Sequence, residues 1–160
     1  MKLLYIILDG LGDRPIRLLK NRTPLEAAVK PHLDELAAKS KLGLMCSIEK
    51  GLAPESDAAT LALFGYNPFE CYNGRGPIEA LGAGIKLRKG DIALRCNFAT
   101  TSNNILKNVE ANLTDEEAKA LANSISKKIK TIDNAKIEFK HTKGYRAVLV
   151  LHGKGLSPRI

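Results

Sequence analysis

Leu3-Leu4-Tyr5-Ile6-Ile7-Leu8, a continuously apolar stretch that ends at Asp9-Gly10, is the part of the sequence that decides the fold class. A strand that is apolar at every position, without alternation, is typical of a sheet covered by helices on both faces. We therefore predict an α/β domain whose first strand spans residues 3–8. Gly43 to Ile48 has the features of a second strand.

A helix is predicted between these two strands. Thr23-Pro24-Leu25-Glu26 combines an N-cap threonine, a proline at the first helical position and a glutamate that can reach back to the cap. The apolar spacing continues through Leu36 and Ala37, and Pro31 is placed to divide the helix into two pieces.

Asp9 and Ser56 are the two candidate catalytic positions of the first half. Asp9 follows a strand at the edge where open α/β sheets gather ligands, and its carboxylate is a hard oxygen ligand for a divalent cation. Ser56 precedes an apolar helix over residues 57–64 that ends before Gly65, so its hydroxyl would lie among free backbone N–H groups. Two plainer readings stand beside these: Asp9 can cap a turn, and Ser56 can simply be the N-cap.

The second half of the sequence changes character near residues 70–76. Residues 92–98 and 146–151 read as strands, and so does the short stretch 137–139. Thr114-Asp115-Glu116-Glu117 opens a helix with a capping box, and a turn is expected at Lys143-Gly144. We therefore predict a β–α–β–β module, with domains at residues 1–72 and 73–160.

Composition excludes several classes of protein. With 160 residues, 44% hydrophobic and 26% charged, the chain is typical of a soluble globular protein, and no apolar run reaches the ~18 residues of a membrane span. The net charge of +8 comes without aromatic interleaving or a nucleic-acid-binding motif, so we expect a solvated lysine-rich face and no nucleic acid partner. Three widely spaced cysteines predict buried thiols in a reducing, cytoplasmic compartment.

Arginines are the remaining candidates for binding an anion. Arg75 lies between two glycines, Arg95 lies within an apolar strand, and Arg146 begins another strand. Guanidinium groups suit carboxylate and phosphate oxygens, although a structural ion pair would explain Arg95 equally well. The three histidines share no metal-ligand spacing, and the sequence has no P-loop.

Several strings resemble one family, the archaeal-type cofactor-independent (2,3-bisphosphoglycerate-independent) phosphoglycerate mutases of the alkaline phosphatase superfamily. The match runs in order along essentially the whole chain. The strings are Ile7-Leu8-Asp9-Gly10-Leu11-Gly12-Asp13-Arg14-Pro15, Thr23-Pro24-Leu25-Glu26-Ala27-Ala28, Ser56-Asp57-Ala58-Ala59, Phe64-Gly65-Tyr66-Asn67-Pro68, Gly74-Arg75-Gly76-Pro77-Ile78-Glu79-Ala80-Leu81-Gly82-Ala83-Gly84 and Arg95-Cys96-Asn97-Phe98-Ala99-Thr100.

The resemblance implies an enzyme that interconverts 3- and 2-phosphoglycerate, a small phosphorylated carboxylate, by way of a metal-activated serine. It implies Ser56 as the nucleophile and two divalent ions (manganese, or zinc or magnesium) with Asp9 and Ser56 among their ligands. It also implies an incomplete alkaline-phosphatase-like sheet domain plus a smaller α+β inserted domain that binds the substrate. The residues expected to bind substrate are Arg75, Arg95, Asn97 and Arg146.

The sequence departs from the family pattern in three places. The remaining Asp and His metal ligands of the family are expected beyond Ile160, in a missing C-terminal half or in another chain, and a homo-oligomer is an alternative. Lys107–Asn112 replaces an arginine-rich stretch, and Glu55 stands where a glycine is common. The isolated chain is therefore expected to be inactive. Two further readings remain open: a diverged binding or structural paralogue, and a related phosphotransferase with another small substrate.

Overall fold

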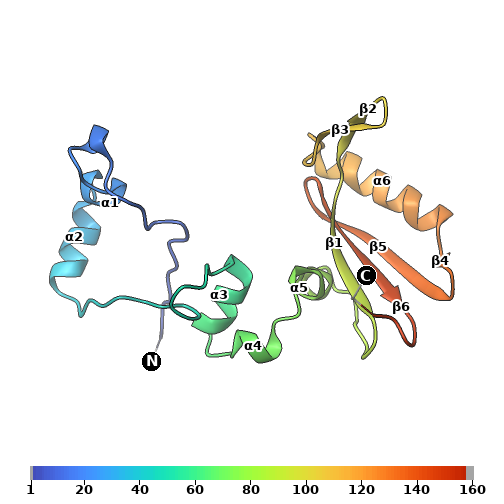
Figure 1. Ribbon diagram of the computed structural model, residues 1–160, viewed down its shortest axis with the longest axis horizontal. Coiled ribbons are helices and arrows are strands. Elements are labelled where there is room, and N and C mark those ends of the chain that lie inside the picture. Colours follow the sequence, from blue (N-terminus) through green and yellow to red (C-terminus); the bar gives the residue numbers. More distant parts are fainter. Residues whose placement is uncertain (1, 158–160) are drawn as a thin grey trace. The chain divides into compact units, whose positions relative to one another are not determined.

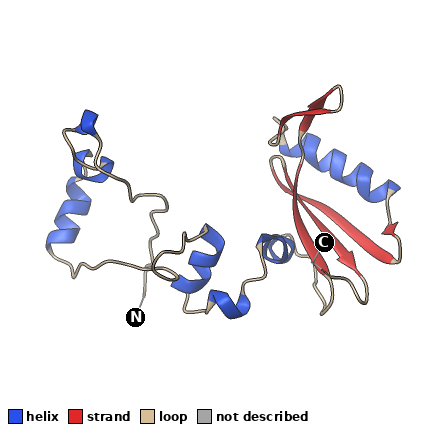
Figure 2. Ribbon diagram, viewed as in Figure 1, coloured by secondary structure: helices blue, strands red, loops and turns tan. Residues whose placement is uncertain are grey.

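The computed structural model describes residues 2–157 and divides into two units, Met1–Glu70 and Cys71–Ile160. Figure 1 gives the order of the elements along the chain, and Figure 2 shows that the strands of the sheets belong to the second unit. The ends of the two predicted domains, Met1 and residues 158–160, lie outside the described residues. Assigning the units to a phosphatase-like part and a substrate-side part stays a prediction.

The N-terminal unit consists of short helices joined by irregular chain. The capping box predicted at Thr23 is confirmed, because the Glu26 N–H donates to Thr23 Oγ1 at 3.2 Å and the Thr23 N–H donates to Glu26 Oε2 at 2.7 Å. The division at Pro31 is also confirmed. The elements are η1 (Arg17–Leu19), α1 (Pro24–Ala27), α2 (Pro31–Ala38), α3 (Ser56–Leu63) and α4 (Pro68–Cys71).

The two strands predicted for this unit, residues 3–8 and 43–48, are not formed, and that prediction was wrong for the chain as it stands. An extended segment becomes a strand only when a neighbour pairs with its backbone, and the only bridge described within residues 2–70 joins Ile16 and Arg22. The apolar side chains that a sheet would bury are at the surface instead: Leu3 is 87% exposed and Ile6 is 70% exposed. Among residues 2–157, no second segment pairs with residues 3–8 or buries them.

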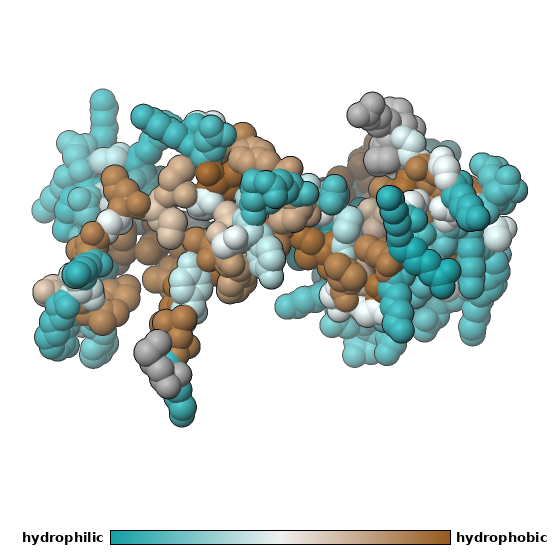
Figure 3. Space-filling view, turned by 90° about the horizontal axis from the view of Figure 1, so that it is seen from below, coloured by the Kyte–Doolittle hydropathy of each residue, from teal (hydrophilic) through white to brown (hydrophobic). Residues whose placement is uncertain are grey.

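Burial is almost absent from the N-terminal unit. Ala58 is the one buried residue among residues 2–70, and brown apolar atoms are visible on the surface of this unit in Figure 3. Exposed apolar side chains include all six of residues 3–8 and three of residues 42–45, Leu42, Leu44 and Met45. A monomeric protein seldom leaves so many large apolar side chains in water.

The C-terminal unit is a mixed α/β module built on an antiparallel sheet with the strand order β1-β6-β5-β4. The predicted strands at 92–98, 137–139 and 146–151 and the turn at Lys143-Gly144 are confirmed, and the structure adds a small hairpin and a two-residue edge strand. The elements are α5 (Arg75–Gly82), β1 (Ile92–Asn97), β2 (Thr100–Ser102), β3 (Ile105–Asn108), α6 (Asp115–Lys128), β4 (Thr131–Ile132), β5 (Ala135–Lys143) and β6 (Arg146–His152).

Two helices contact this sheet and supply its core. Val148 and Val150 of β6 are fully buried against Ala80 and Ile85, which belong to α5 and the loop after it. α6 packs on β5 through its buried face, which includes Ala118 and Ala122 (Figure 1). Within residues 2–157, no helix has both the length and the apolar character that crossing a bilayer requires.

Gly76 sets how closely α5 approaches the sheet. A Cβ atom at this position would lie 1.9 Å from the backbone oxygen of Ala93 in β1, which is far inside van der Waals contact. The backbones of helix and strand therefore touch directly, and the close approach requires glycine.

We predict that Gly76→Ala lowers the free energy of unfolding of the C-terminal unit by about 3 kcal/mol, because the added methyl group must push α5 off β1. Gly82→Ala, in the same helix, is the matched control, since nothing lies within 4 Å of its added Cβ. That substitution should be neutral or stabilise by up to about 1 kcal/mol. Hydrogen exchange of the β6 amides measures both, and equal effects of the two changes would contradict the close-contact explanation.

The capping box predicted for α6 is also present. Glu117 Oε2 accepts the Thr114 backbone N–H at 2.9 Å and the Thr114 hydroxyl at 3.1 Å. The backbone hydrogen bond from Thr114, and then the side-chain one, hold the pKa of the Glu117 carboxyl below its ordinary value of 4.5. A carboxyl whose pKa is lowered on folding stabilises the fold above its unfolded pKa, and this contribution is lost as the pH falls through the folded pKa.

We therefore predict that Glu117→Gln makes the C-terminal unit less stable at neutral pH, and that the difference from the wild type shrinks as the pH falls below about 4.5. Glutamine keeps an oxygen acceptor but has no charge to lose. Glu116→Gln, one residue earlier in the same turn, is the control. Urea unfolding of all three proteins at neutral and acid pH tests this, and a difference that stays constant with pH would refute it.

Candidate functional site

Asp9 and Ser56 meet in the N-terminal unit although they are 47 positions apart. Ser56 Oγ donates a hydrogen bond to Asp9 Oδ2 at 3.2 Å, and both side chains are exposed to solvent. Gly10, which follows Asp9, has φ +71°, so the chain turns immediately after the carboxylate through a conformation that favours glycine. The predicted convergence of the two oxygen groups is therefore present.

The helix begins one position earlier than the sequence indicated. Ser56 is the first residue of α3, and Glu55, with extended backbone angles, is the N-cap. The prediction that Ser56 is the N-cap was wrong, so its hydroxyl is not committed to capping and can reach Asp9. The predicted helix end is confirmed, since Gly65 has φ +86° directly after the C-cap Phe64.

The Asp9–Ser56 pair has the chemistry of a partial metal site. A carboxylate and a hydroxyl are hard oxygen ligands, and neighbouring ligands in the octahedral shell of Mg²⁺ at 2.0–2.1 Å lie about 3 Å apart. The observed O–O separation of 3.2 Å therefore suits two oxygens that share one cation. Among the residues described, no group of three or more His, Cys, Asp or Glu side chains is gathered closely enough to hold a metal ion.

The substrate-binding candidates lie in the C-terminal unit, at one end of its sheet. Arg95 and Asn97 are two positions apart on β1, so they lie on the same face, and Arg146 of β6 is the register partner of Asn97. Arg75 is the first residue of α5 and directly precedes Gly76, whose backbone touches β1. The structure thus brings Arg95, Asn97 and Arg146 to one face, while their predicted role in binding substrate stays a prediction.

Two of these side chains have neighbours within the unit. Asn97 Nδ2 donates to the Val109 carbonyl at 3.3 Å, and the guanidinium of Arg146 lies 5.5 Å from the centroid of the Tyr145 ring. Arg95 is half-buried in β1. Cys96 follows it, and burial raises the pKa of the Cys96 thiol despite a backbone hydrogen bond at Leu149 that lowers it.

The histidines were the residues that the sequence analysis missed. Their spacing predicted no metal site and indicated no other role, but His141 and His152 are both partly buried beside carboxylates. His141 Nε2 lies 3.7 Å from Asp115 Oδ1, and His152 Nδ1 lies 2.8 Å from Asp91 Oδ2. In each pair the partners are more than twenty positions apart in the sequence, so local spacing carries no signal of them.

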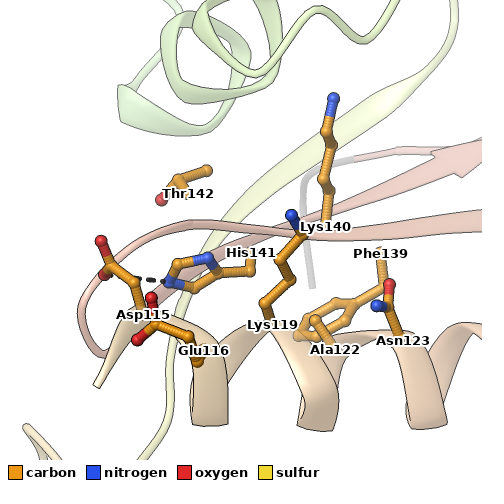
Figure 4. Close-up of a pocket in the computed structure, with 9 residues that line it drawn as sticks. All are labelled: Asp115, Glu116, Lys119, Ala122, Asn123, Phe139, Lys140, His141 and Thr142. Carbon is orange, nitrogen blue, oxygen red and sulfur yellow. Dashed lines mark ion pairs between the residues drawn. The ribbon is translucent and has the colours of Figure 1, made fainter. Parts of the chain in front are cut away.

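Figure 4 shows the pocket that contains His141, between α6 and β5, with a volume of about 490 Å³. Asp115 Oδ1 accepts the Gly144 backbone N–H at 2.6 Å, and a ring nitrogen of His141 lies 2.9 Å from the Gly144 carbonyl. These contacts fix the β5–β6 turn to the start of α6. We therefore interpret the polar groups at this end of the pocket as structural.

Comparison with known proteins identifies what the chain resembles. A family model described as 2,3-bisphosphoglycerate-independent phosphoglycerate mutase matches residues 37–160. The protein of that name from Sulfolobus acidocaldarius is 47% identical over 160 residues, and 2,3-bisphosphoglycerate-independent phosphoglycerate mutase 1 from Methanocaldococcus jannaschii is 48% identical over 161 residues. Each alignment covers 99% of this chain but only 39% and 38% of those relatives.

A solved structure is also similar to this chain. A protein from Pyrococcus horikoshii is 42% identical and superposes with a TM-score of 0.73, over 91% of this chain and 35% of that one. This chain therefore spans about two fifths of the length of the curated relatives that it matches.

Proposed function

Because the chain belongs to the 2,3-bisphosphoglycerate-independent phosphoglycerate mutase family, we propose that it carries the nucleophile and one metal-binding carboxylate of a phosphotransfer site. In this proposal Ser56 is the nucleophile and Asp9 its partner, and the reaction moves a phosphoryl group between the 3- and 2-hydroxyls of glycerate. The observation that carries the proposal is the contact of Ser56 Oγ with Asp9 Oδ2 at 3.2 Å, across 47 positions of the sequence.

The residues of this chain would act in a simple order. Asp9 holds Ser56 Oγ through its hydrogen bond and so orients the oxygen that attacks phosphorus. The new bond joins Ser56 Oγ to phosphorus, the bond from phosphorus to the substrate 3-oxygen breaks, and that oxygen takes up a proton. The proton that the 3-oxygen takes up replaces the one that Ser56 Oγ loses on attack. The 2-hydroxyl then attacks phosphorus, the bond from phosphorus to Ser56 Oγ breaks, and the proton lost by the 2-hydroxyl is balanced by the one that Ser56 Oγ takes up.

Divalent cations, when bound, would neutralise the phosphoryl oxygens and lower the pKa of the serine hydroxyl. Asp9 and Ser56 are the two ligands that this pair offers, and the N-terminal end of the α3 dipole would add positive potential beside Ser56. Arg75, Arg95, Asn97 and Arg146 are proposed to bind the carboxylate and phosphate of the substrate, because guanidinium groups bind both in a bidentate way.

The apolar surface of the N-terminal unit supports a second element of the proposal. We propose that a polypeptide equivalent to the unmatched three fifths of the relatives covers residues 3–8 and 42–45. By pairing with these segments it would complete an alkaline-phosphatase-like sheet and supply the remaining metal ligands. The support is that Ala58 alone is buried among residues 2–70, which leaves no core to stabilise these segments.

One observation favours a related phosphotransferase that acts on another small substrate. Where the family resemblance leads one to expect an arginine-rich stretch, Lys107–Asn112 has a single cation. Its Glu110 accepts the Tyr145 hydroxyl at 2.7 Å, and its Val109 carbonyl accepts from Asn97. This stretch therefore contacts other elements of the unit. With one cation in place of several arginines, it would suit a substrate that has fewer anionic groups.

We predict that Ser56→Ala abolishes phosphotransfer by the completed protein, with a loss of at least about a thousandfold, because the alanine leaves no atom to accept the phosphoryl group. The completed protein is this chain combined with the part of a relative's chain that it does not match. Ser40→Ala is the matched control, since the Ser40 hydroxyl donates to the Leu36 carbonyl at the end of α2. Activity that survives Ser56→Ala would remove Ser56 from the mechanism.

We also predict that the 160-residue chain alone has little mutase activity with manganese, and that adding the unmatched part of a relative restores it. The reason is the shortfall of ligands, because Asp9 and Ser56 cannot fill the coordination shells of two ions. A coupled assay of 2-phosphoglycerate formation measures this, with size-exclusion chromatography to detect the complex. Rapid turnover by the pure chain, or a homo-oligomer that is active alone, would contradict the prediction.

A further inference from the structure

The excess positive charge of the protein belongs entirely to the C-terminal unit. Residues 71–160 contain 16 Lys and Arg against 8 Asp and Glu, which accounts for the whole net charge of +8, whereas residues 1–70 contain nine of each sign. A field of this kind draws anions to the unit. Net charge does not locate a binding site. An anion would be held where a pocket of the unit is lined by several of these cations.

One pocket gathers cations around a histidine. It has a volume of about 470 Å³ and lies between the loop after α5 and the ends of β5 and β6. Lys86 and Arg88 come from the loop, and Lys136 and His152 come from the strands, where they are direct register partners. Its remaining lining residues are Gly84, Ile85 and Glu138. The lining thus has three permanent cations against one carboxylate.

A buried carboxylate orients the histidine of this pocket. The Asp91 side chain is only 5% exposed, and its Oδ2 accepts the Arg88 backbone N–H at 2.8 Å and lies 2.8 Å from His152 Nδ1. Burial raises the pKa of Asp91, but these two hydrogen bonds and the nearby positive charge outweigh it, so the pKa lies below the ordinary value of 3.8. An ionised Asp91 can only accept, so the Nδ1 atom of His152 carries a proton.

The other ring nitrogen of His152 is left on the side of the pocket. Nε2 lies 3.6 Å from Glu138 Oε2, outside hydrogen-bond distance, and Glu138 lines the same pocket. The His152 side chain is 23% exposed. Lys86, Arg88 and Lys136 are exposed, and no ion pair is described for them among residues 2–157. The charge of Arg88 also helps to lower the pKa of Asp91, so the two lysines are the cations that face a ligand without another charged neighbour described.

We propose that this pocket, formed by Lys86, Arg88, Lys136 and His152, binds a small phosphate-bearing molecule. Lysine and arginine side chains are the usual partners of phosphate oxygens, and a pocket of this volume has the size of small-molecule sites. His152 Nε2 accepts a hydrogen bond from a protonated phosphate oxygen, or donates one when the ring is charged.

This site is separate from the residues proposed to bind the mutase substrate. His152 and Arg146 occupy opposite ends of β6, six positions apart, which corresponds to roughly 20 Å along an extended strand. A phosphate group held by His152 therefore cannot also be held by Arg146 through direct contacts. The inference does not depend on Ser56 or Asp9.

The test is a titration of the full 160-residue chain, labelled with ¹⁵N, with inorganic phosphate and separately with glycerol 3-phosphate, at constant ionic strength. We expect saturable shifts of the backbone amides of residues 84–88 and of the ring nitrogens of His152. The ring of His32, in the other unit, should not move. Tighter binding of the ester would identify a phosphorylated metabolite as the ligand class, and tighter binding of phosphate would identify the free ion.

Matched variants distinguish binding at this pocket from non-specific attraction by the positive charge of the unit. Lys86→Ser with Lys136→Ser should weaken binding at least tenfold, whereas Lys107→Ser with Lys128→Ser removes the same charge elsewhere and should leave binding within twofold. Ser56→Ala should not change it, so failure of the proposed mutase function leaves this result intact. Equal weakening by both double variants, equal displacement by chloride, or binding of a short single-stranded RNA without either phosphate probe would overturn the proposal.

Discussion

The hydrogen bond from Ser56 Oγ to Asp9 Oδ2 is the contact on which the functional account rests. It joins the turn that follows the apolar segment 3–8 to the first residue of α3. Each of these groups has an ordinary structural explanation when taken alone, since aspartates cap turns and serines cap helices. Their approach to 3.2 Å, in a chain of the phosphoglycerate mutase family, is the observation that supports the proposed catalytic role.

The two units are stabilised in different ways, and the difference bears on function. The C-terminal unit has a layered core in which Val148 and Val150 are fully buried and Gly76 allows helix and strand to touch. The N-terminal unit holds the catalytic candidates but buries only Ala58 among residues 2–70. A site that must position reacting atoms within fractions of an ångström needs rigid support, which further burial around residues 3–8 would provide.

The sequence predicted local features well because their causes are local. The capping boxes at Thr23 and Thr114, the break at Pro31 and the turn at Gly144 each depend on a few adjacent residues, and each is present. The predictions of strands at 3–8 and 43–48 were wrong because a strand needs a partner segment to pair with, and the pattern within one segment does not show whether such a partner is present. Ser56 was displaced from the N-cap position because Glu55 adopts the extended conformation that ends the loop.

Contacts between residues distant in the sequence could be predicted only in part. The Asp9–Ser56 contact was anticipated because Asp9 ends the apolar stretch 3–8 and Ser56 stands at the start of an apolar helix. The Asp91–His152 pair was not, because its partners are 61 positions apart and neither end stands in a motif. Such pairs arise from strand register, which places His152 opposite Lys136 and beside the loop that follows α5.

The most direct measurement of the central claim is the chemical state of Ser56 during turnover. The chain, combined with the part of a relative that it does not match, would be mixed with 3-phosphoglycerate, quenched in acid within the first turnovers and digested for mass spectrometry. The account predicts a phosphoryl group on the peptide that contains Ser56. Turnover with that peptide unmodified, or with the phosphoryl group on another residue, would contradict it.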